Sequence, residues 1–248
     1  MTGRAFRALA VTALVLAATP AARGQELVAD LSSHRVAIST GFTGSQVVLF
    51  GATGGEGDVA LVVRGPDERV VVRRKDRIAG IWVNRAGMVF EGVPAYYAVA
   101  SNRPLEAFMS PAVMARNQIG VEHLRLTAEA DGLEDEVATF RAALVRNKQR
   151  DGLFPVELGK VVFLGARLFR TDLYFPANVP TGNYTVKVFL IRDGQVVSAQ
   201  TTPLFVSKTG MEAKISQFAH RNSFYYGLFA VVLALMAGWF ADFVFRRV

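Results

Sequence analysis

No cysteine occurs among the 248 residues of this chain. Its absence excludes disulfide bridges, iron–sulfur clusters, thiolate zinc sites and thiol catalysis. A part of the chain exported from the cytoplasm must therefore be stabilised by its hydrophobic core alone. About 200 residues outside the two termini are enough to build such a core.

Recognisable catalytic motifs are also lacking. No Gly-x-Ser-x-Gly, His-Glu-x-x-His or deaminase pattern occurs. The glycine-rich residues 51–57 lack the Lys-Ser/Thr ending and the following helix of a phosphate-binding loop, so they are expected to form a hairpin loop. His34, His123 and His220 lie in three different kinds of segment, and metal binding would need folding to bring them together. We therefore expect no catalytic residue, no cofactor and no metal, and a protein that is not an enzyme.

Acidic residues are fewer than basic ones, 21 against 28, which gives a net charge of +7. Five of the basic residues lie near the chain ends, three in residues 1–24 and two in residues 246–248. The part between is nearly balanced, so the excess charge does not predict a nucleic-acid partner.

One long apolar run is present, at residues 224–241, and it contains no charged residue. With its neighbours it reaches the roughly 20 residues that a helix needs to cross a bilayer. Aromatic residues lie near both ends, and Arg246 and Arg247 follow directly, which favours a cytoplasmic C-terminus. We expect a transmembrane helix at 223–245. The alternative is a buried core helix, although such helices usually carry a polar stripe.

The N-terminus has the layout of a secretory signal peptide. Arg4 and Arg7 precede the apolar residues 8–18, and small residues follow up to position 24. Cleavage before Gln25 would leave the chain up to residue 222 in the periplasm, held by a single span in the bacterial inner membrane. The alternative is an uncleaved N-terminal anchor, for which the apolar run is short.

Residues 25–103 consist of short apolar runs separated by turn-forming residues. The expected strands include residues 36–38, 47–50, 59–63, 70–72 and 81–83. Turns are expected at 51–58, 64–69 and 84–87. A strand about every ten residues favours a β-sandwich over a βαβ sheet, which needs a helix at each crossover.

Residues 104–152 change to a helical period and are expected to form a helical insertion. Asp131 and Glu134 form the pattern of a capping box. Val137, Phe140 and Leu144 then recur on one face of a helix that Gly152 ends, and Leu133 extends the same face. A shorter helix is expected at 104–116.

Strands resume in residues 153–208, at 161–164 and 168–175. Tyr184, Val186, Val188 and Leu190 are expected to alternate inward, and Asp193-Gly194 is a two-residue hairpin turn. Tyr184 follows a Pro-x-Gly-x-Tyr lead similar to the tyrosine corner of immunoglobulin-like sandwiches, in which Trp82 would be buried.

The expected fold is mainly β: a periplasmic immunoglobulin-like β-sandwich domain with a helical insertion, plus one C-terminal transmembrane helix. The segments are a signal peptide (1–24), a first β-rich part (25–103), the insertion (104–152), a second β-rich part (153–208), a juxtamembrane stalk (209–222), the transmembrane helix (223–245) and a cytoplasmic tail (246–248).

Four basic residues, Arg73, Arg74, Lys75 and Arg77, form the densest cluster of charge. Arginine forks suit oxyanions, carboxylates and lipid phosphates, so this cluster is a candidate contact for an anion or a partner. The alternative is a solvated strand end balanced by nearby acids.

A second candidate surface lies on the expected membrane helix. Ala230, Ala234, Gly238 and Asp242 recur every four residues and share one stripe. Small residues on a stripe allow another helix to approach closely, either a partner's or that of a second copy. The alternative is an accidental pattern with Asp242 wetted at the interface.

Four segments resemble the signature stretches of an alphaproteobacterial family of predicted membrane proteins without known function: GDVALVVRGP (57–66), VRRK (72–75), GIWVN (80–84) and VPAYYAVASNRPL (93–105). The resemblance implies a similar layout and no catalytic residues, and members are often encoded beside sulfite or sulfonate exporters. We expect a non-enzymatic periplasmic interaction or accessory subunit of an inner-membrane complex, with a transporter as one candidate partner. The alternative is a small-oxyanion-binding protein serving such an exporter.

Overall fold

The fold was obtained as a computed structural model that describes residues 26–78, 80–129, 134–209 and 223–245. Strands dominate these residues, so the expectation of a mainly β protein is confirmed. The expected signal peptide, nearly all of the stalk and the three-residue tail lie outside the described residues.

Nine strands form one continuous sheet, in the order β1-β3-β10-β9-β7-β4-β11-β12-β2. The strands are β1 (Leu27–Leu31), β2 (Arg35–Ile38), β3 (Gly44–Thr53), β4 (Asp58–Arg64), β7 (Tyr97–Ser101), β9 (Gly159–Phe163), β10 (Leu168–Pro176), β11 (Gly182–Arg192) and β12 (Gln195–Lys208). Most neighbours are antiparallel, while β12 with β2 and β7 with β9 are parallel.

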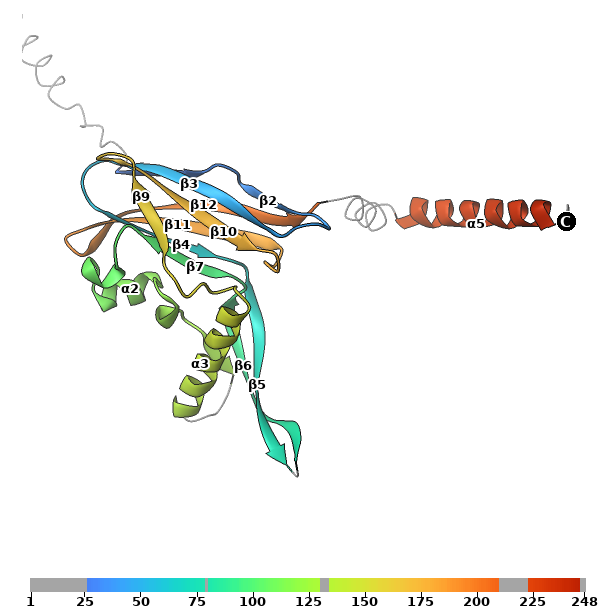
Figure 1. The fold of residues 1–248 in the computed structure, drawn as a ribbon, viewed down its shortest axis with the longest axis horizontal. Helices are drawn as coiled ribbons and strands as arrows, with labels where there is room; N and C mark the ends of the chain where they lie inside the picture. Colours follow the sequence, from blue (N-terminus) through green and yellow to red (C-terminus); the bar gives the residue numbers. More distant parts are fainter. Residues whose placement is uncertain (1–25, 79, 130–133, 210–222, 246–248) are drawn as a thin grey trace, which may run out of the picture.

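The sheet curls until its two halves face each other across the core (Figure 1). The halves are joined by the short β7–β9 pairing, where Ala100 lies opposite Gly159. On the other side, the Gln200 side-chain amide of β12 bridges to edge strand β1. It accepts from the Ala29 amide at 2.8 Å and donates to the Ala29 carbonyl at 2.7 Å. One side chain thus satisfies two backbone groups that an edge strand would leave unpaired.

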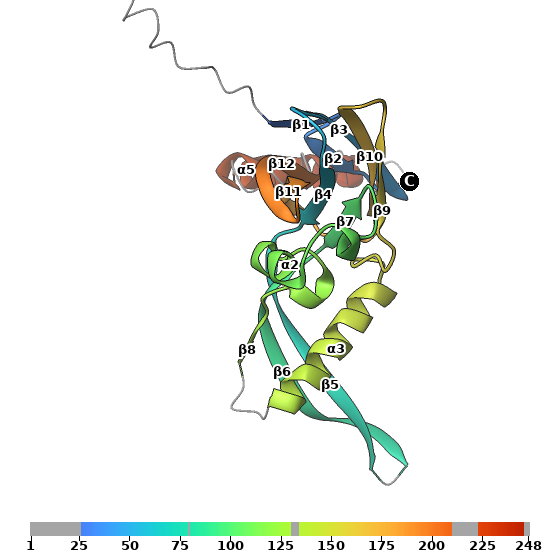
Figure 2. The same cartoon turned by 90° about the vertical axis from the view of Figure 1, so that its left-hand side faces the viewer.

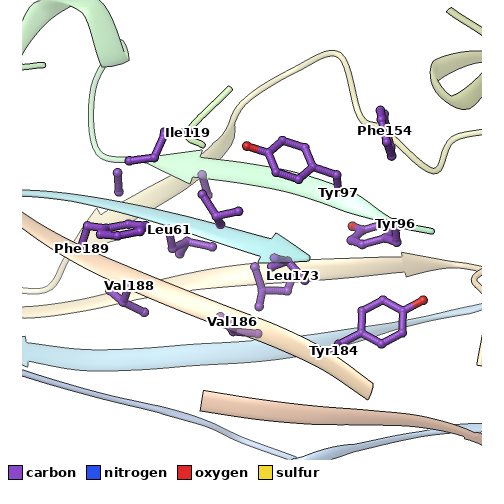
Figure 3. Close-up of a cluster of buried hydrophobic side chains, with 14 of the residues drawn as sticks. Leu61, Tyr96, Tyr97, Ile119, Phe154, Leu173, Tyr184, Val186, Val188 and Phe189 are labelled. Atoms are coloured by element: carbon purple, nitrogen blue, oxygen red, sulfur yellow. The ribbon is translucent and has the colours of Figure 1, made fainter. Parts of the chain in front are cut away.

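The core combines buried side chains of the curled sheet with others from the segment between β7 and β9, such as Ile119 and Phe154 (Figure 3). On β11, Tyr184, Val186 and Val188 are buried, as their alternation predicts. The Tyr96 ring lies 5.4 Å from that of Phe175 and 6.1 Å from that of Tyr184, within the range of favourable aromatic pairs.

The hydroxyl of Tyr184 donates to the Pro180 carbonyl four residues upstream, at 2.6 Å. A tyrosine corner makes a hydrogen bond of this kind. The hairpin turn at Asp193-Gly194 is confirmed, because both residues have positive φ, 49° and 73°, as a type I′ turn requires. The immunoglobulin-like assignment of the whole domain stays a prediction.

A second, three-stranded sheet projects from one end of the curled sheet (Figure 2). It consists of β5 (Asp67–Ile78), β6 (Ile81–Pro94) and β8 (Thr127–Glu129), in the order β5-β6-β8. The expected turn at 84–87 is wrong, because these residues continue β6, and the chain reverses between Ile78 and Ile81 instead.

The helical elements lie between β7 and β9 in the chain. They are η1 (Leu105–Ala107), α2 (Pro111–Asn117), η2 (Val121–His123) and α3 (Glu134–Arg150). The single helix expected at 104–116 is therefore split in two. In α3, Phe140 and Leu144 are buried and Val137 packs against the core, as predicted, and Gly152 (φ 71°) follows the end of the helix. Asp131 and Leu133, on which the capping box and the start of this face depend, lie outside the described residues.

The last described element is α5 (Ser223–Phe245), a 23-residue helix that stands apart from the sheets in Figure 1. The described apolar side chains point outward on every side; they include Leu228, Phe229, Val231, Leu235 and Phe240, all exposed. The structure leaves several side chains of α5 undescribed. Among the described residues, no helix is long and apolar enough to cross a membrane.

Candidate functional site

The hairpin of β5 and β6 is the most prominent feature of the surface, and its outer part has no core. Near its base, Val72 lies opposite Met88, and Val70 opposite Phe90; Val72, Met88 and Phe90 are buried. Beyond the Val72–Met88 pair, none of the described side chains of the hairpin is buried. We call this outer part, residues 73–78 and 80–87, the distal arm; it extends past α3 in both views (Figures 1 and 2).

The base of the hairpin is held by ion pairs. Arg69 reaches Glu129 of β8 at 2.5 Å and Glu91 of β6 at 3.7 Å, which joins all three strands of this sheet. The hydrogen bond from Arg69 lowers the pKa of Glu129, while the hydrogen bond with Glu129 raises the pKa of Glu91. These ion pairs are exposed, so they add little to the folding stability of the protein. Their main effect is to hold β5, β6 and β8 together at the base of the hairpin.

A nearly buried lysine connects α3 to the same base. The Lys148 side chain lies with its ammonium against the Glu68 carboxylate of β5, 3.5 Å from the Ala95 carbonyl and 5.9 Å from the centre of the Phe154 ring. Lys148 is only 8% exposed. Because a buried ammonium needs such partners, the end of α3 is tied to the start of the hairpin.

The distal arm carries the four basic residues that the sequence singles out. Arg73, Arg74, Lys75 and Arg77 are all exposed. Arg74 lies 3.7 Å from the carboxylate of Asp76. The register shifts between Arg74 and Lys75, a β-bulge that increases the twist of the ribbon. The four side chains follow one another along strand β5.

Two large apolar side chains are exposed at the tip. Ile81 is 68% exposed and Trp82 is 65% exposed. Gly80 has φ +85°, which the reversal requires, and its carbonyl accepts from the Arg77 side chain at 3.2 Å. The prediction of a buried core Trp82 is wrong, because none of the described sheets and helices covers the end of the hairpin.

A depression on the β-rich part lies elsewhere, near the β11–β12 turn. It has a volume of about 480 Å³ and is lined in part by Asp58, Arg103, Phe108 and Arg192. Arg103 binds Asp58 through two hydrogen bonds of 2.7 and 2.5 Å. Burial alone would raise the pKa of Asp58, but hydrogen bonds from Arg103 and Asn102 lower it.

Arg192, the second arginine of this depression, is also occupied. It donates to the Glu56 carbonyl at 2.7 Å and to the Glu26 carboxylate at 3.1 Å. In both arginines the guanidinium group is therefore already engaged with protein oxygens and is not fully available to a bound anion. Within the described ranges, no group of His, Asp and Glu side chains has the arrangement of a metal site.

The stripe expected on α5 is described only in part. Ala234 is exposed, and nothing lies within 4 Å of the position that a Cβ would take at Gly238. The side chains of Ala230 and Asp242 lie outside those described, so the contact surface stays a prediction.

Sequence comparison identifies a protein family that matches this chain. The family described as “Putative transmembrane protein (Alph_Pro_TM)” matches residues 26–247, nearly the whole chain. The chain belongs to this family. The resemblance inferred from the four sequence segments is thereby confirmed. No curated protein and no solved structure matches the chain.

Sequence reasoning found the basic cluster but missed the arm that presents it. The available signal was Ala79-Gly80 between two strand-like runs, since two-residue loops ending in glycine favour hairpins. The segment 84–87 also contains turn-forming residues, so the turn was predicted there and not between Ile78 and Ile81.

Proposed function

We propose that this chain is a non-enzymatic accessory protein of the bacterial inner membrane, and that its distal arm binds another component of that membrane. In this proposal, α5 anchors the chain and the β-rich part lies in the periplasm. The observation that carries the proposal is the arm itself: a two-stranded ribbon without a core, with Ile81 and Trp82 exposed at its tip.

An isolated two-stranded hairpin is only marginally stable in water. Aromatic and aliphatic side chains exposed together at its end add no internal packing there, but they offer apolar area to a binding partner. Contacts that bury Trp82 would supply both affinity and order, because tryptophan is among the residues that dominate binding energies.

Membrane anchoring is supported by three observations. Residues 224–241 lack any charge, the described apolar side chains of α5 are exposed on all sides, and the family is described as transmembrane. The proposal rests on the whole apolar run and not on the described part of α5 alone. A helix that is apolar all round is typical of a bilayer span.

The alternative, a periplasmic oxyanion-binding protein serving a sulfite- or sulfonate-type exporter, has less support. Its binding site would need arginines converging on a pocket. Arg103 and Arg192 are the arginines at the depression, and both are paired with protein groups. Arg73 and Arg74 project from a free ribbon.

Site-specific photo-crosslinking in cells tests the proposal. A photoreactive amino acid replaces Trp82 in the full chain, and the matched control replaces Val156, which is 76% exposed and lies outside the arm. We expect a discrete adduct with a membrane component from position 82 and none from position 156. No adduct at position 82, or the same adducts from both positions, would contradict the proposal.

A further inference from the structure

The chemistry of the distal arm narrows the identity of the component that it binds. We propose that the arm inserts its tip into the headgroup region of an anionic phospholipid bilayer, with the basic residues at lipid phosphates. This inference rests on the proposed function and names the partner of the same arm. The domain would then be attached to the membrane at two points, α5 and the arm.

Charge complementarity is the first support. The distal arm contains five basic residues, Arg73, Arg74, Lys75, Arg77 and Arg85, and Asp76 is its sole acidic residue. The β-rich part as a whole is nearly balanced, so the positive charge is concentrated in this ribbon. Each lysine or arginine near an anionic membrane strengthens binding by roughly fivefold, and guanidinium groups pair well with phosphates.

The tip matches the apolar part of the same surface. Tryptophan prefers the boundary between headgroups and acyl chains, because its ring is apolar and its N–H remains near water. Trp82 lies opposite Arg77 on the neighbouring strand. Basic side chains with long apolar stems beside a tryptophan are typical of a segment that enters this boundary.

The distribution of the charges favours a lipid surface over an acidic protein. Successive strand residues point to opposite faces, so Arg73 and Arg74 lie on opposite sides of the ribbon. A protein surface that covers one face would leave the cations of the other face unpaired. Headgroups can surround a ribbon that enters end-on, and all of its basic residues then find phosphates.

The length of the chain permits both attachments to one bilayer. Residues 210–222 comprise thirteen positions between the described part of the sheet and α5. When extended, such a segment spans at most about 45 Å. The 12-residue strand β5 is about 40 Å long. A tether of this reach allows the tip to meet the membrane that holds α5.

Tryptophan fluorescence of the full chain tests the inference directly. The chain has two tryptophans, Trp82 and Trp239. Trp239→Phe leaves Trp82 as the single reporter. The protein is reconstituted into vesicles of phosphatidylcholine, with or without about a third of phosphatidylglycerol, and brominated lipids serve as quenchers. We expect a blue-shifted emission and bromine quenching in the anionic vesicles only.

Two sets of variants make the test specific. Arg73→Ser, Arg74→Ser and Lys75→Ser together should weaken the apparent lipid affinity of the arm on the order of a hundredfold, at about fivefold for each residue. The bromine quenching of Trp82 should fall accordingly. The control set removes equal charge from exposed residues outside the arm: Arg35→Ser, Arg116→Ser and Arg167→Ser. It should leave the quenching unchanged, and inorganic phosphate should not shift the emission.

The outcomes separate this inference from the proposed function. A water-like emission of Trp82 without quenching in anionic vesicles overturns the lipid inference. If position 82 nevertheless crosslinks to a protein in cells, the proposed function stands and the partner is an acidic protein. If neither quenching nor crosslinking occurs, both fail. Equal losses in the two triple variants would mean that overall charge, and not the arm, binds the lipid.

Discussion

At the scale of single residues, three buried tyrosines donate their hydroxyls to backbone carbonyls. The Tyr96, Tyr97 and Tyr184 hydroxyls donate to the carbonyls of Tyr174 (2.7 Å), Gln118 (2.7 Å) and Pro180 (2.6 Å), respectively. Burial raises the pKa of each of the three phenols. Because the charged phenolate is disfavoured there, folding should oppose their ionisation.

The sign of the resulting pH dependence follows from linkage. The folded state binds these protons more tightly than the unfolded state, where the tyrosine pKa is about 10. The stabilisation is therefore complete below about pH 10 and is lost as the pH rises toward the folded-state values. Each tyrosine should contribute a slope of about 1.4 kcal/mol per pH unit in that window.

Urea unfolding of the full chain in neutral detergent, at pH 8, 10 and 11, measures this effect. Above pH 10 the unfolding free energy of the wild type should fall with pH. In Tyr97→Phe this slope should be smaller by the contribution of one tyrosine, about 1.4 kcal/mol per pH unit. The control Tyr174→Phe changes an exposed side chain and should leave the slope as it is. Identical pH profiles for wild type and Tyr97→Phe would refute the linkage.

The Lys148–Glu68 pair makes a second prediction at this scale, because the two partners differ in exposure. Their side chains are 10% and 37% exposed, respectively. Glu68→Gln leaves a nearly buried ammonium without its carboxylate and should cost about 3 kcal/mol of unfolding free energy. Lys148→Met leaves a carboxylate that water can reach, so it should cost less.

Chemical denaturation of the two variants and of the double variant checks this order. The double variant should be closer to wild type than Glu68→Gln alone, since it removes both charges. A larger loss for Lys148→Met than for Glu68→Gln would contradict the assignment of Lys148 as the desolvated partner.

At the scale of elements, patterns with local causes could be predicted from the sequence. The burial of Tyr184, Val186 and Val188 on β11 and the Asp193-Gly194 turn depend on period and backbone preference alone, and both are confirmed. The buried face of α3 is confirmed for the same reason, through Phe140 and Leu144.

The hairpin of β5 and β6 could not be predicted in the same way. Its strands continue beyond the last buried pair, Val72 and Met88, so hydrophobic alternation does not mark their ends. A tryptophan in a strand is buried only if another layer covers it. No local pattern shows that Trp82 lies beyond every such layer, and its exposure therefore had to come from the structure.

The helix α5 carries a prediction of its own. If its stripe of small residues contacts another helix, Ala234→Leu and Gly238→Leu should disrupt association with a partner or a second copy, because close approach needs small side chains. Val231→Leu and Leu235→Ala, on a neighbouring face, are the controls and should have little effect. A bacterial two-hybrid or crosslinking assay compares the two sets. Equal effects from both would count against a specific contact face.

At the scale of the whole molecule, the sheet order was beyond sequence reasoning. β2 pairs with β12 although the two strands are near opposite ends of the β-rich part, and β1 is bridged to β12 by one side chain, Gln200. Such long-range pairings depend on the assembled core and leave no periodic signal along the chain. The mainly β class was predictable, and so was the presence of helices between residues 104 and 152.

The orientation in the membrane is a prediction for the whole chain. The signal-like N-terminus and the terminal arginines both favour a periplasmic β-rich part. Alkaline phosphatase, which is active only outside the cytoplasm, should be active when fused after Lys208. An inactive fusion at this position, with normal amounts of protein, would reverse the proposed topology.

The binding role of the distal arm is tested most directly by hydrogen–deuterium exchange of the full chain. Exchange is compared between inner-membrane vesicles and neutral detergent. In detergent, residues 73–78 and 80–87 should exchange rapidly, because a ribbon without a core opens at little cost. In the membrane, binding should slow their exchange by about tenfold or more, while β11 stays equally protected in both. Equally rapid exchange of the arm in both environments would contradict its role as the binding element.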